Sequence, residues 1–367
     1  MPPLPDRDAV LNALRAVVEP DIRKDIVTLG MVKDLAVDGG RVGFTLELMT
    51  HASPLKEQLR EQAVAAVRAL PGVASVEVKP TVRVRSVSQP EKGAPPLPGV
   101  KNVIAVGAGK GGVGKTTVAV NLALALARCG SRVGILDGDI YGPNIPIMLG
   151  LTGSTLATDG KQIVPAEKYG VQVVSVGFLT NDDAPVIWRG PMLHQAINQF
   201  FKEVAWRDLD YLIVDMPPGT GDVALSLSQT VPVVGSIVVT TPQQVALADS
   251  RRAVRMYQKL SIPTLGIVEN MSYYACTNCH HETDIFGHGG GEALATQMEV
   301  PFLGRLPIYQ PIREGSDAGI PLVVGEPGSA AARSFITVAE RAAAQVSIAA
   351  QKSLEANRGK IPLIPVR

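Results

Sequence analysis

The stretch Gly-Lys-Gly-Gly-Val-Gly-Lys-Thr-Thr at residues 109–117 decides the fold of this chain. A glycine, four further residues and then Gly-Lys-Thr form the pattern of a phosphate-binding loop. The glycines let consecutive backbone N–H groups point at phosphate oxygens, and the N-terminus of the following helix adds partial positive charge. Lys115 would reach the β- and γ-phosphates of a nucleotide, and the Thr116 hydroxyl would bind Mg²⁺. The pattern predicts a nucleotide-binding site made of Gly109, Lys110, Gly111, Gly112, Val113, Gly114, Lys115, Thr116 and Thr117.

The segments around this loop predict an α/β fold. Apolar strands are expected at 101–107, 132–137, 171–177, 211–215, 236–240, 264–269 and 301–306. Helices are expected near 114–129, 190–204, 222–230, 243–260 and 328–356. Apolar strands that alternate with helices indicate a mostly parallel, doubly wound sheet that is covered on both faces, as in P-loop NTPases. Ligands of such sheets bind at the carboxyl ends of the strands, where the motifs of this chain lie.

The chain divides by composition into four parts. Residues 1–85 predict a small α+β domain, with helices at 8–18 and 55–70 and strands at 35–38, 42–48, 76–79 and 82–85. Residues 86–99 form a Pro-rich linker, which is expected to be extended. Residues 100–356 form the predicted ATPase domain, and residues 357–367 form a tail.

Composition bounds the possible functions. The chain has 367 residues, is 46% hydrophobic and carries a net charge of +1, which excludes a strong field towards nucleic acid or an anionic membrane. Its first residues are unlike a signal peptide, and the apolar stretch 231–239 is too short to span a bilayer. Three cysteines, an odd number, argue against a disulfide framework, so we expect a protein of the reducing cytoplasm.

Acidic residues end two of the predicted strands. Asp137-Gly-Asp139 ends the strand 132–137, and Asp215 ends the strand 211–215 in the manner of a Walker B motif. These carboxylates, together with the Thr116 hydroxyl, can hold Mg²⁺ and its bound water and can position an attacking water. Asp and Gly are also common in turns, so the Asp-Gly-Asp motif depends on the phosphate loop for its meaning. The expected Mg²⁺ ligands are Thr116, Asp137 and Asp215.

Cys276 and Cys279 form a Cys-x-x-Cys pair. Two thiolates at this spacing can bind one metal ion or two corners of an iron–sulfur cluster. The remaining cysteine, Cys129, ends the first helix of the ATPase domain and is expected to be a buried apolar side chain. One chain therefore supplies half of a four-thiolate set, which a homodimer would complete on its two-fold axis. Taken alone, the pair favours a zinc site, which the nearby His280, His281 and His288 could complete. A redox-active cysteine pair is a further alternative.

The loop resembles the deviant Walker A motif of the MinD, ParA and nitrogenase iron protein class, because a second lysine stands at 110. The resemblance implies a nucleotide-dependent homodimer in which Lys110 reaches the nucleotide of the partner. It also implies that Asp139 orients the attacking water, with Asp137 in support, and that Asn270, placed at the end of the strand 264–269, recognises the adenine base. An amide can pair with an adenine edge, although Asn is also a common strand-ending residue.

The set of motifs as a whole resembles the Mrp/ApbC iron–sulfur cluster carrier ATPases over about residues 100–345. The likeness rests on the deviant Walker A motif, residues 137–144, 215–222, 240–243 and 269–272, and the Cys-x-x-Cys pair, which occur in this order. It implies slow, Mg²⁺-dependent ATP hydrolysis. It also implies a homodimer that bridges a [4Fe–4S] cluster through Cys276 and Cys279 of both chains. The partners would be apo iron–sulfur proteins and cluster-assembly scaffolds, with no nucleic acid and no membrane.

The N-terminal part resembles a small domain of iron–sulfur assembly factors through Glu19-Pro-Asp-Ile, Leu29-Gly-Met-Val and Thr50-His-Ala-Ser-Pro54. Related domains carry a cysteine before this proline, whereas here Ser53 stands there, and a hydroxyl is a poor ligand for a soft metal. We therefore interpret this domain as a docking or regulatory module. The open alternatives for the whole chain are a positioning ATPase of the MinD/ParA type and a zinc-stapled dimeric ATPase without a cluster.

Overall fold

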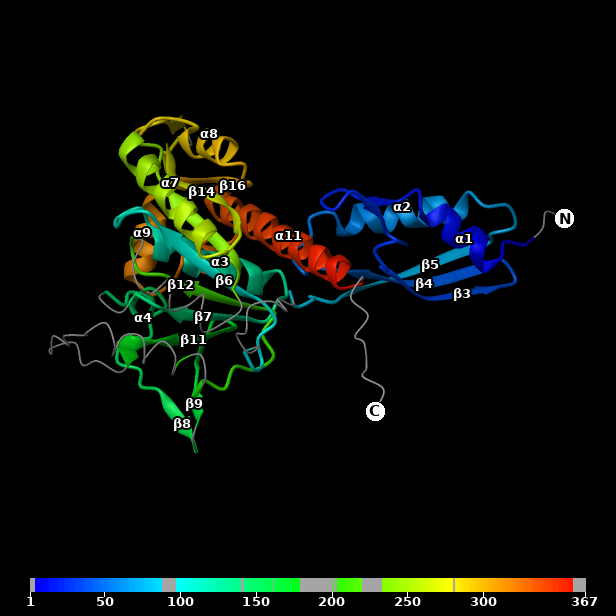
Figure 1. Cartoon of the computed structure of the whole chain (residues 1–367), viewed down its shortest axis with the longest axis horizontal. Helices are drawn as coiled ribbons and strands as arrows, with labels where there is room; N and C mark the ends of the chain where they lie inside the picture. The colour runs from blue at the N-terminus through cyan, green and yellow to red at the C-terminus, as the bar shows by residue number, and fades with distance from the viewer. Residues whose placement is uncertain are drawn as a thin grey trace, which may run out of the picture. The chain divides into compact units, whose positions relative to one another are not determined.

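The computed structural model describes residues 4–87, 97–139, 142–160, 162–178, 200, 203–219, 233–279 and 281–358. The chain separates into two compact units, Met1–Arg85 and Ser86–Arg367 (Figure 1). The helix expected at 222–230, most of that at 190–204 and most of the Pro-rich linker lie outside the described residues.

The first unit is a three-stranded sheet with two helices on one face (Figure 1). Its strands are β3 (Val32–Asp38), β4 (Arg41–Leu48) and β5 (Ser75–Val82), and its helices are α1 (Arg7–Leu14) and α2 (Lys56–Arg68). The expected hairpin is confirmed, since β3 and β4 pair antiparallel. Gly39 and Gly40 connect them with φ of 53° and 86°, a conformation that glycine adopts without strain.

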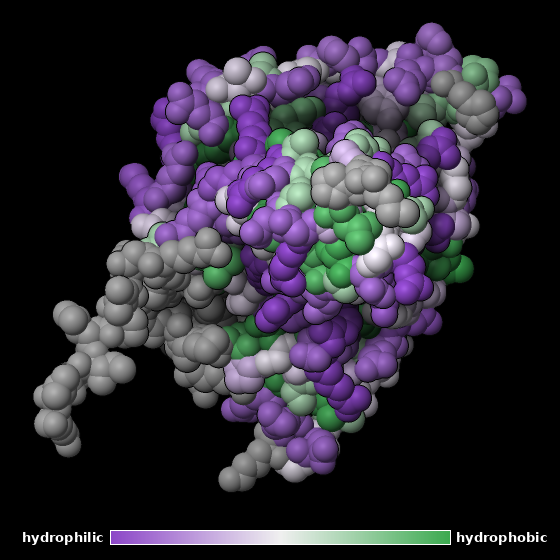
Figure 2. Space-filling view, turned by 90° about the vertical axis from the view of Figure 1, so that its right-hand side faces the viewer, coloured by the Kyte–Doolittle hydropathy of each residue, from purple (hydrophilic) through white to green (hydrophobic). Residues whose placement is uncertain are grey.

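The two strands expected at 76–79 and 82–85 are wrong, because a single strand, β5, runs through Pro80 and pairs parallel with β4. Proline is tolerated there because β5 lies at the sheet edge, where a missing N–H breaks no ladder. A short two-stranded sheet of β1 (Val18–Glu19) and β2 (Lys24–Asp25) completes the unit. Figure 2 looks onto the end of the first unit, where a small hydrophobic patch lies among mostly hydrophilic residues.

The second unit is built on a sheet of nine strands within the described residues. Seven of them run parallel in the order β11-β7-β12-β6-β13-β14-β16. Their bounds are β6 (Val103–Ala108), β7 (Val133–Asp137), β11 (Val171–Ser175), β12 (Tyr211–Asp215), β13 (Val233–Thr240), β14 (Thr264–Ala275) and β16 (Phe302–Ile308). Antiparallel strands are added by β10 (Ala166–Lys168) and β15 (Glu282–Thr283), while β8 (Ala157–Asp159) and β9 (Gln162–Val164) pair separately.

Helices cover both faces of this sheet. The crossover from β6 through α3 (Lys115–Arg128) to β7 and that from β13 through α7 (Gln244–Lys259) to β14 run in opposite directions across the sheet. Right-handed crossovers in opposite directions place their helices on opposite faces. Accordingly α11 (Ala330–Arg358) packs on α3, and α8 (Gly290–Gln297) packs on α7 (Figure 1). The connections that leave the neighbouring strands β6 and β13 run in opposite directions, so the loop after β6 lies at the topological switch point where ligands bind.

The other helices whose full extent the structure describes are short. They are α4 (Ile145–Met148), the 3₁₀ turn η1 (Val176–Phe178), α9 (Gln310–Asp317) and α10 (Leu322–Gly325). No helix among the residues described combines the length and the apolar character that crossing a membrane requires.

Several expected boundaries are wrong. The helix expected at 8–18 ends at Leu14, and Val18 lies in β1. The strand expected at 236–240 begins earlier, at Val233. The strand expected to end at 177 ends at Ser175 and continues as η1, and α11 runs to Arg358, past its expected end. The strand expected at 264–269 is the larger error, since β14 continues to Ala275. Asn270 therefore lies inside β14 and does not end a strand.

Candidate functional site

The glycine-rich loop (residues 109–117) joins β6 to α3 at the switch point of the sheet. Gly112 and Gly114 both have a φ of 79°, and Gly114 is the N-cap of α3. A Cβ at Gly109 would meet the backbone of Asp249 at 2.2 Å, so no larger residue fits there. The backbone conformation and the close packing explain why this loop needs its glycines.

Lys115, Thr116 and Asp215 converge directly behind this loop. The Lys115 Nζ donates to Asp215 Oδ1 over 2.6 Å, and Thr116 Oγ1 donates to Asp215 Oδ2 over 2.7 Å. Asp139 Oδ2 lies 3.8 Å from Lys115 Nζ, so the lysine lies between two carboxylates. Burial raises the pKa of Asp215, and the ammonium group of Lys115 opposes this effect. Four of the predicted site residues are thus brought together.

Asp137 lies at the end of β7 and accepts hydrogen bonds from β11 and from the segment that follows β7. Ser175 Oγ donates to Asp137 Oδ2 over 3.0 Å, and the backbone N–H groups of Asp139 and Ile145 also donate to its carboxylate. Burial, with a contribution from the neighbouring Asp215, raises the pKa of Asp137 to about 8. These contacts fix the backbone that carries Asp139, which fits a supporting role.

Asn270 contacts the glycine-rich loop from β14. Its Nδ2 donates to the carbonyl oxygen of Val113 over 2.8 Å. The same nitrogen lies too close to Gly114 for that residue to carry a Cβ. Only 6% of Asn270 is exposed. This hydrogen bond, which sequence reasoning missed, ties Asn270 to the glycine-rich loop and stabilises the loop conformation.

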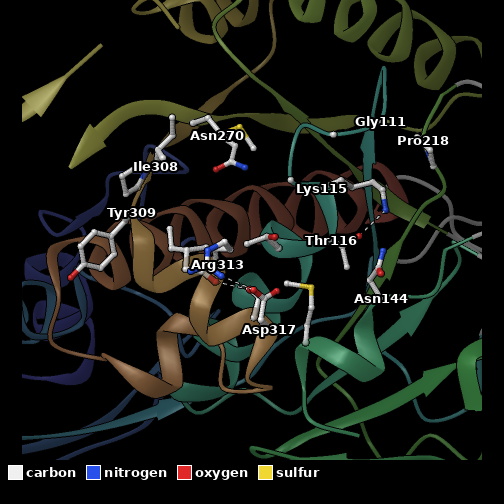
Figure 3. A pocket seen from close by; sticks show the side chains of 18 of the residues that line it. Gly111, Lys115, Thr116, Asn144, Pro218, Asn270, Ile308, Tyr309, Arg313 and Asp317 are labelled. Atoms are coloured by element: carbon white, nitrogen blue, oxygen red, sulfur yellow. Dashed lines mark hydrogen bonds and ion pairs between the residues drawn. The ribbon is translucent and has the colours of Figure 1, made fainter. Parts of the chain in front are cut away.

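A cavity of about 830 Å³ opens over the loop, which is within the range of small-molecule sites. One wall is formed by the glycine-rich loop with Asp139 and Asn270, as Figure 3 shows for Lys115, Thr116 and Asn270. Sequence reasoning missed the opposite wall, which includes Phe286, Pro307, Ile308, Tyr309, Ile312 and Arg313. Figure 3 labels Ile308, Tyr309 and Arg313 of this wall, across the cavity from Lys115 and Thr116. The only sequence signal for it was the position of Pro307 and Ile308 at the carboxyl end of a parallel strand.

Lys110 also lines this cavity and is partly exposed. Within the residues that the structure describes, its ammonium group has neither a hydrogen-bond nor an ion-pair partner. Lys115 is held at the sheet, so the two lysines of the loop have distinct environments.

Cys276 follows the last residue of β14, and Cys279 lies in the turn that leads to β15. Both thiols are free; Cys279 is exposed, and Cys276 is partly exposed. The backbone N–H groups of Cys279 and Asn278 donate to the Cys276 sulfur and lower the pKa of its thiol. Among the described residues, which do not include His280, no three His, Cys, Asp or Glu side chains lie close enough together to bind a metal ion. His288 instead lies 3.3 Å from Asp284 and from Arg305.

Comparison with known proteins decides the family. Residues 99–343 match the family model described as the NUBPL iron-transfer P-loop NTPase, of the ParA group. This chain belongs to that family. Residues 7–79 match a second family model, described as an iron–sulfur cluster assembly protein.

Curated relatives of the family span nearly the whole chain. An iron–sulfur cluster carrier protein of Synechocystis is 49% identical over 94% of this chain and 98% of its own length. The protein of the same name from Escherichia coli K12 is 42% identical over 91% of this chain and 93% of its own. Among solved structures, a nucleotide-binding protein from Archaeoglobus fulgidus in complex with ADP is 38% identical. That match covers 61% of this chain and 88% of the other, with a TM-score of 0.55. The resemblance to P-loop NTPases and iron–sulfur carriers expected from the motifs is confirmed at the level of the family.

Proposed function

We propose that this protein carries a [4Fe–4S] cluster to apo-proteins as a homodimer, under the control of slow, Mg²⁺-dependent ATP hydrolysis. The observation that carries the proposal is the accessible pair Cys276 and Cys279 directly beyond β14, on the strand whose Asn270 contacts the nucleotide loop. The names of the relatives support a carrier role. The cluster is the cargo of this reaction, and its source would be a cluster-assembly scaffold. Free cysteines fit the reducing cytoplasm that we propose as its location.

The nucleotide half of the function follows from the groups around Lys115. With ATP in the cavity, Lys115 would leave Asp215 for the β- and γ-phosphates, and the backbone N–H groups of residues 109–117 would bind the phosphate oxygens. The Thr116 hydroxyl and the Asp215 carboxylate, which lie 2.7 Å apart, are the hard oxygen ligands that suit Mg²⁺. Bound Mg²⁺ would neutralise charge that develops on the phosphates. Asp139 would orient the attacking water, and Asp137 would hold the turn that carries it.

The base would occupy the far wall of the cavity. Phe286, Ile308 and Ile312 supply apolar surface there, as a planar base requires. Asn270 lines the same cavity and would contact the adenine edge there, in addition to its hydrogen bond with Val113.

The homodimer follows from two incomplete sites. Two cysteines are half of the four thiolates that hold a [4Fe–4S] cluster, and a second copy would supply the others. Lys110, which has no partner among the described residues, would reach the γ-phosphate bound by the second copy and would act there as an arginine finger does elsewhere. The N-terminal unit, which matches an assembly-protein model, would serve as the docking or regulatory module.

Oxygen-free reconstitution with iron and sulfide tests the cargo. We expect charge-transfer absorption near ~400 nm and about four iron and four sulfide per two chains. Cys276→Ala and Cys279→Ala should each abolish it. Cys129→Ala is the matched control, because this half-buried residue caps α3 away from the pair, and it should load fully.

Three results would contradict the proposal: full loading of Cys276→Ala, a strictly monomeric loaded protein, or purified protein that holds zinc with no iron. The last would favour the zinc-stapled dimer.

A further inference from the structure

β14 contains an irregular segment between the nucleotide cavity and the cysteine pair. After a first register shift between Ile267 and Val268, it pairs with β16 up to Glu269, opposite Arg305, and again from Tyr273, opposite Pro307. The three residues 270–272 therefore oppose the single residue Leu306, which makes a β-bulge. Met271, at its centre, has a φ of 53°, a conformation that costs free energy for any residue with a side chain.

Buried polar contacts on both sides hold the bulge. Ser272 Oγ donates to Glu269 Oε1 over 2.5 Å, and the Gly291 N–H donates to Glu269 Oε2. Glu269 and Ser272 are fully buried. Asn270 extends from the bulge in the other direction, to Val113 in the glycine-rich loop. The strained backbone is thus fixed at one side by the protein core and at the other by the loop itself.

The strand that leaves the bulge leads directly to the thiols. Tyr273 and Tyr274 pair with Pro307 and Ile308 of β16, and Tyr274 also pairs with β15. Cys276 follows two residues later, and its N–H donates to the carbonyl oxygen of His281. Six extended residues span about 20 Å, so β14 alone bridges the distance from Asn270 to Cys276.

The neighbours of this strand also form walls of the cavity. Asn270 and Met271 line it from the bulge, Pro307 and Ile308 line it from β16, and Phe286 lines it from the segment after β15. A nucleotide in the cavity would therefore touch β16 and the segment that follows β15, next to the strand that leads to Cys276.

We propose that the bulge at residues 270–272 is the element through which nucleotide binding moves the Cys276–Cys279 turn. A nucleotide draws the glycine-rich loop onto its phosphates, the Val113 carbonyl moves with the loop, and Asn270 transmits this movement to a segment that is already strained. Relaxation of Met271 then shifts Tyr273 to Cys276 along β16. This inference deepens the proposed function and rests on its nucleotide site, but it needs no cluster to be present.

Coupling of this kind is reciprocal. If a nucleotide favours one arrangement of the Cys276–Cys279 turn, a group attached to the thiols that favours one arrangement changes nucleotide affinity in turn. Typical couplings of equilibrium affinities correspond to factors of about 5 to 150. An alkylation rate is a kinetic quantity, so both measurements must change but need not change by the same factor.

The experiment uses the full-length, cluster-free protein with ADP and Mg²⁺ as the probe. Mass spectrometry measures the iodoacetamide alkylation rate of Cys276 and Cys279 at one fixed pH, with and without ADP. We expect a change of about fivefold or more in wild type. Protein alkylated at both thiols should also show a changed ADP affinity. Equal rates with and without saturating ADP would overturn the proposal.

Met271→Gly removes the strain, since glycine adopts positive φ freely. Because Met271 lines the cavity, the ADP affinity of the variant is measured first, and alkylation is compared without ADP and at a concentration that saturates the variant's own site. The dependence of alkylation on ADP should be lost. Glu299→Gly is the matched control, because Glu299 also has a positive φ of 54° but is exposed and lies outside β14. It should keep the full dependence. A Met271→Gly protein that keeps it as well would overturn the proposal.

A second readout covers a Met271→Gly protein that fails to fold. In wild type, ADP should change the amide hydrogen exchange of the peptide 271–276, and an unchanged peptide would contradict the inference. Failure of ADP to bind at all would count against the proposed function, whereas failed cluster reconstitution with intact coupling would leave this inference standing.

Discussion

The ammonium nitrogen of Lys115 lies 2.6 Å from Asp215 Oδ1, and the two side chains are 7% and 0% exposed. Under the proposed function, Lys115 would bind the phosphates of ATP and Asp215 would bind Mg²⁺, and in this structure the two side chains neutralise each other. ATP and Mg²⁺ would have to take over both roles together, because either charge left alone in this buried place is costly. The site would then take up the metal–nucleotide complex as a unit.

Lys115→Met should destabilise the nucleotide-free protein by about 3 kcal/mol, since it leaves a buried carboxylate without its partner. Lys115→Met with Asp215→Asn should recover much of this loss, because the fully buried carboxylate that Lys115 neutralises is then also removed. Urea unfolding followed by tryptophan fluorescence measures both, since Trp206 is buried in the second unit. Equal losses in the single and double variants would contradict the coupling. The single variant should also lower ATP hydrolysis by about 100-fold or more.

Lys110 should act on the nucleotide of the second copy. Lys110→Ala and Asp139→Ala should each abolish ATP hydrolysis, with ADP binding preserved in the first. A mixture of the two variants should recover activity. In a mixed dimer one site has its own Asp139 and the partner's intact lysine, so an equal mixture regains about a quarter of wild-type sites. An inactive mixture would show that Lys110 works within its own chain or not at all.

The sequence was sufficient for the parts of the site that are local. The glycine-rich loop and the strand-ending residues Asp137 and Asp215 are read from contiguous residues, because a strand, a tight loop and a helix start impose their own residue types. Their meeting behind the loop follows from the rule that parallel strands end at one edge of the sheet. The contact of Lys115 with Asp215 is a direct consequence.

What the sequence could not supply depends on register and on distant segments. The bulge at Met271 exists because β14 and β16 fall out of step, which no single strand encodes. The apolar cavity wall at Ile308 and Ile312 comes from β16 and α9, nearly two hundred residues after the loop. The length of β14 was foreseeable, since Tyr273 and Tyr274 are strong strand formers beyond the expected end.

Phe286 should contribute to binding of the base. Phe286→Ala should weaken ADP binding by about 2- to 10-fold, the range expected when one aromatic stacking contact is lost. The affinity for inorganic pyrophosphate, which lacks a base, should not change. Titration calorimetry measures both ligands. Val245→Ala is the control, because Val245 is 70% exposed and does not line the cavity. An equal loss for both ligands would place Phe286 outside the base site.

Glu19 should make the first unit less stable as the pH rises. Burial, with repulsion from Asp21, raises the pKa of this carboxyl, although the Ile22 N–H donates to it over 2.7 Å. Between the unfolded and folded pKa values of Glu19, the folded protein holds a proton that the unfolded chain has released, so stability falls with increasing pH.

Glu19→Gln keeps an acceptor for the Ile22 N–H but cannot ionise. The stability of this variant relative to wild type should therefore increase as the pH rises from the acidic range through the folded pKa of Glu19. Amide hydrogen exchange of α1 in the full-length protein at a series of pH values measures this, with exchange rates corrected for pH. Glu61→Gln, on an exposed position of α2, should follow wild type throughout. A Glu19→Gln protein with the pH dependence of wild type would assign that dependence to other groups.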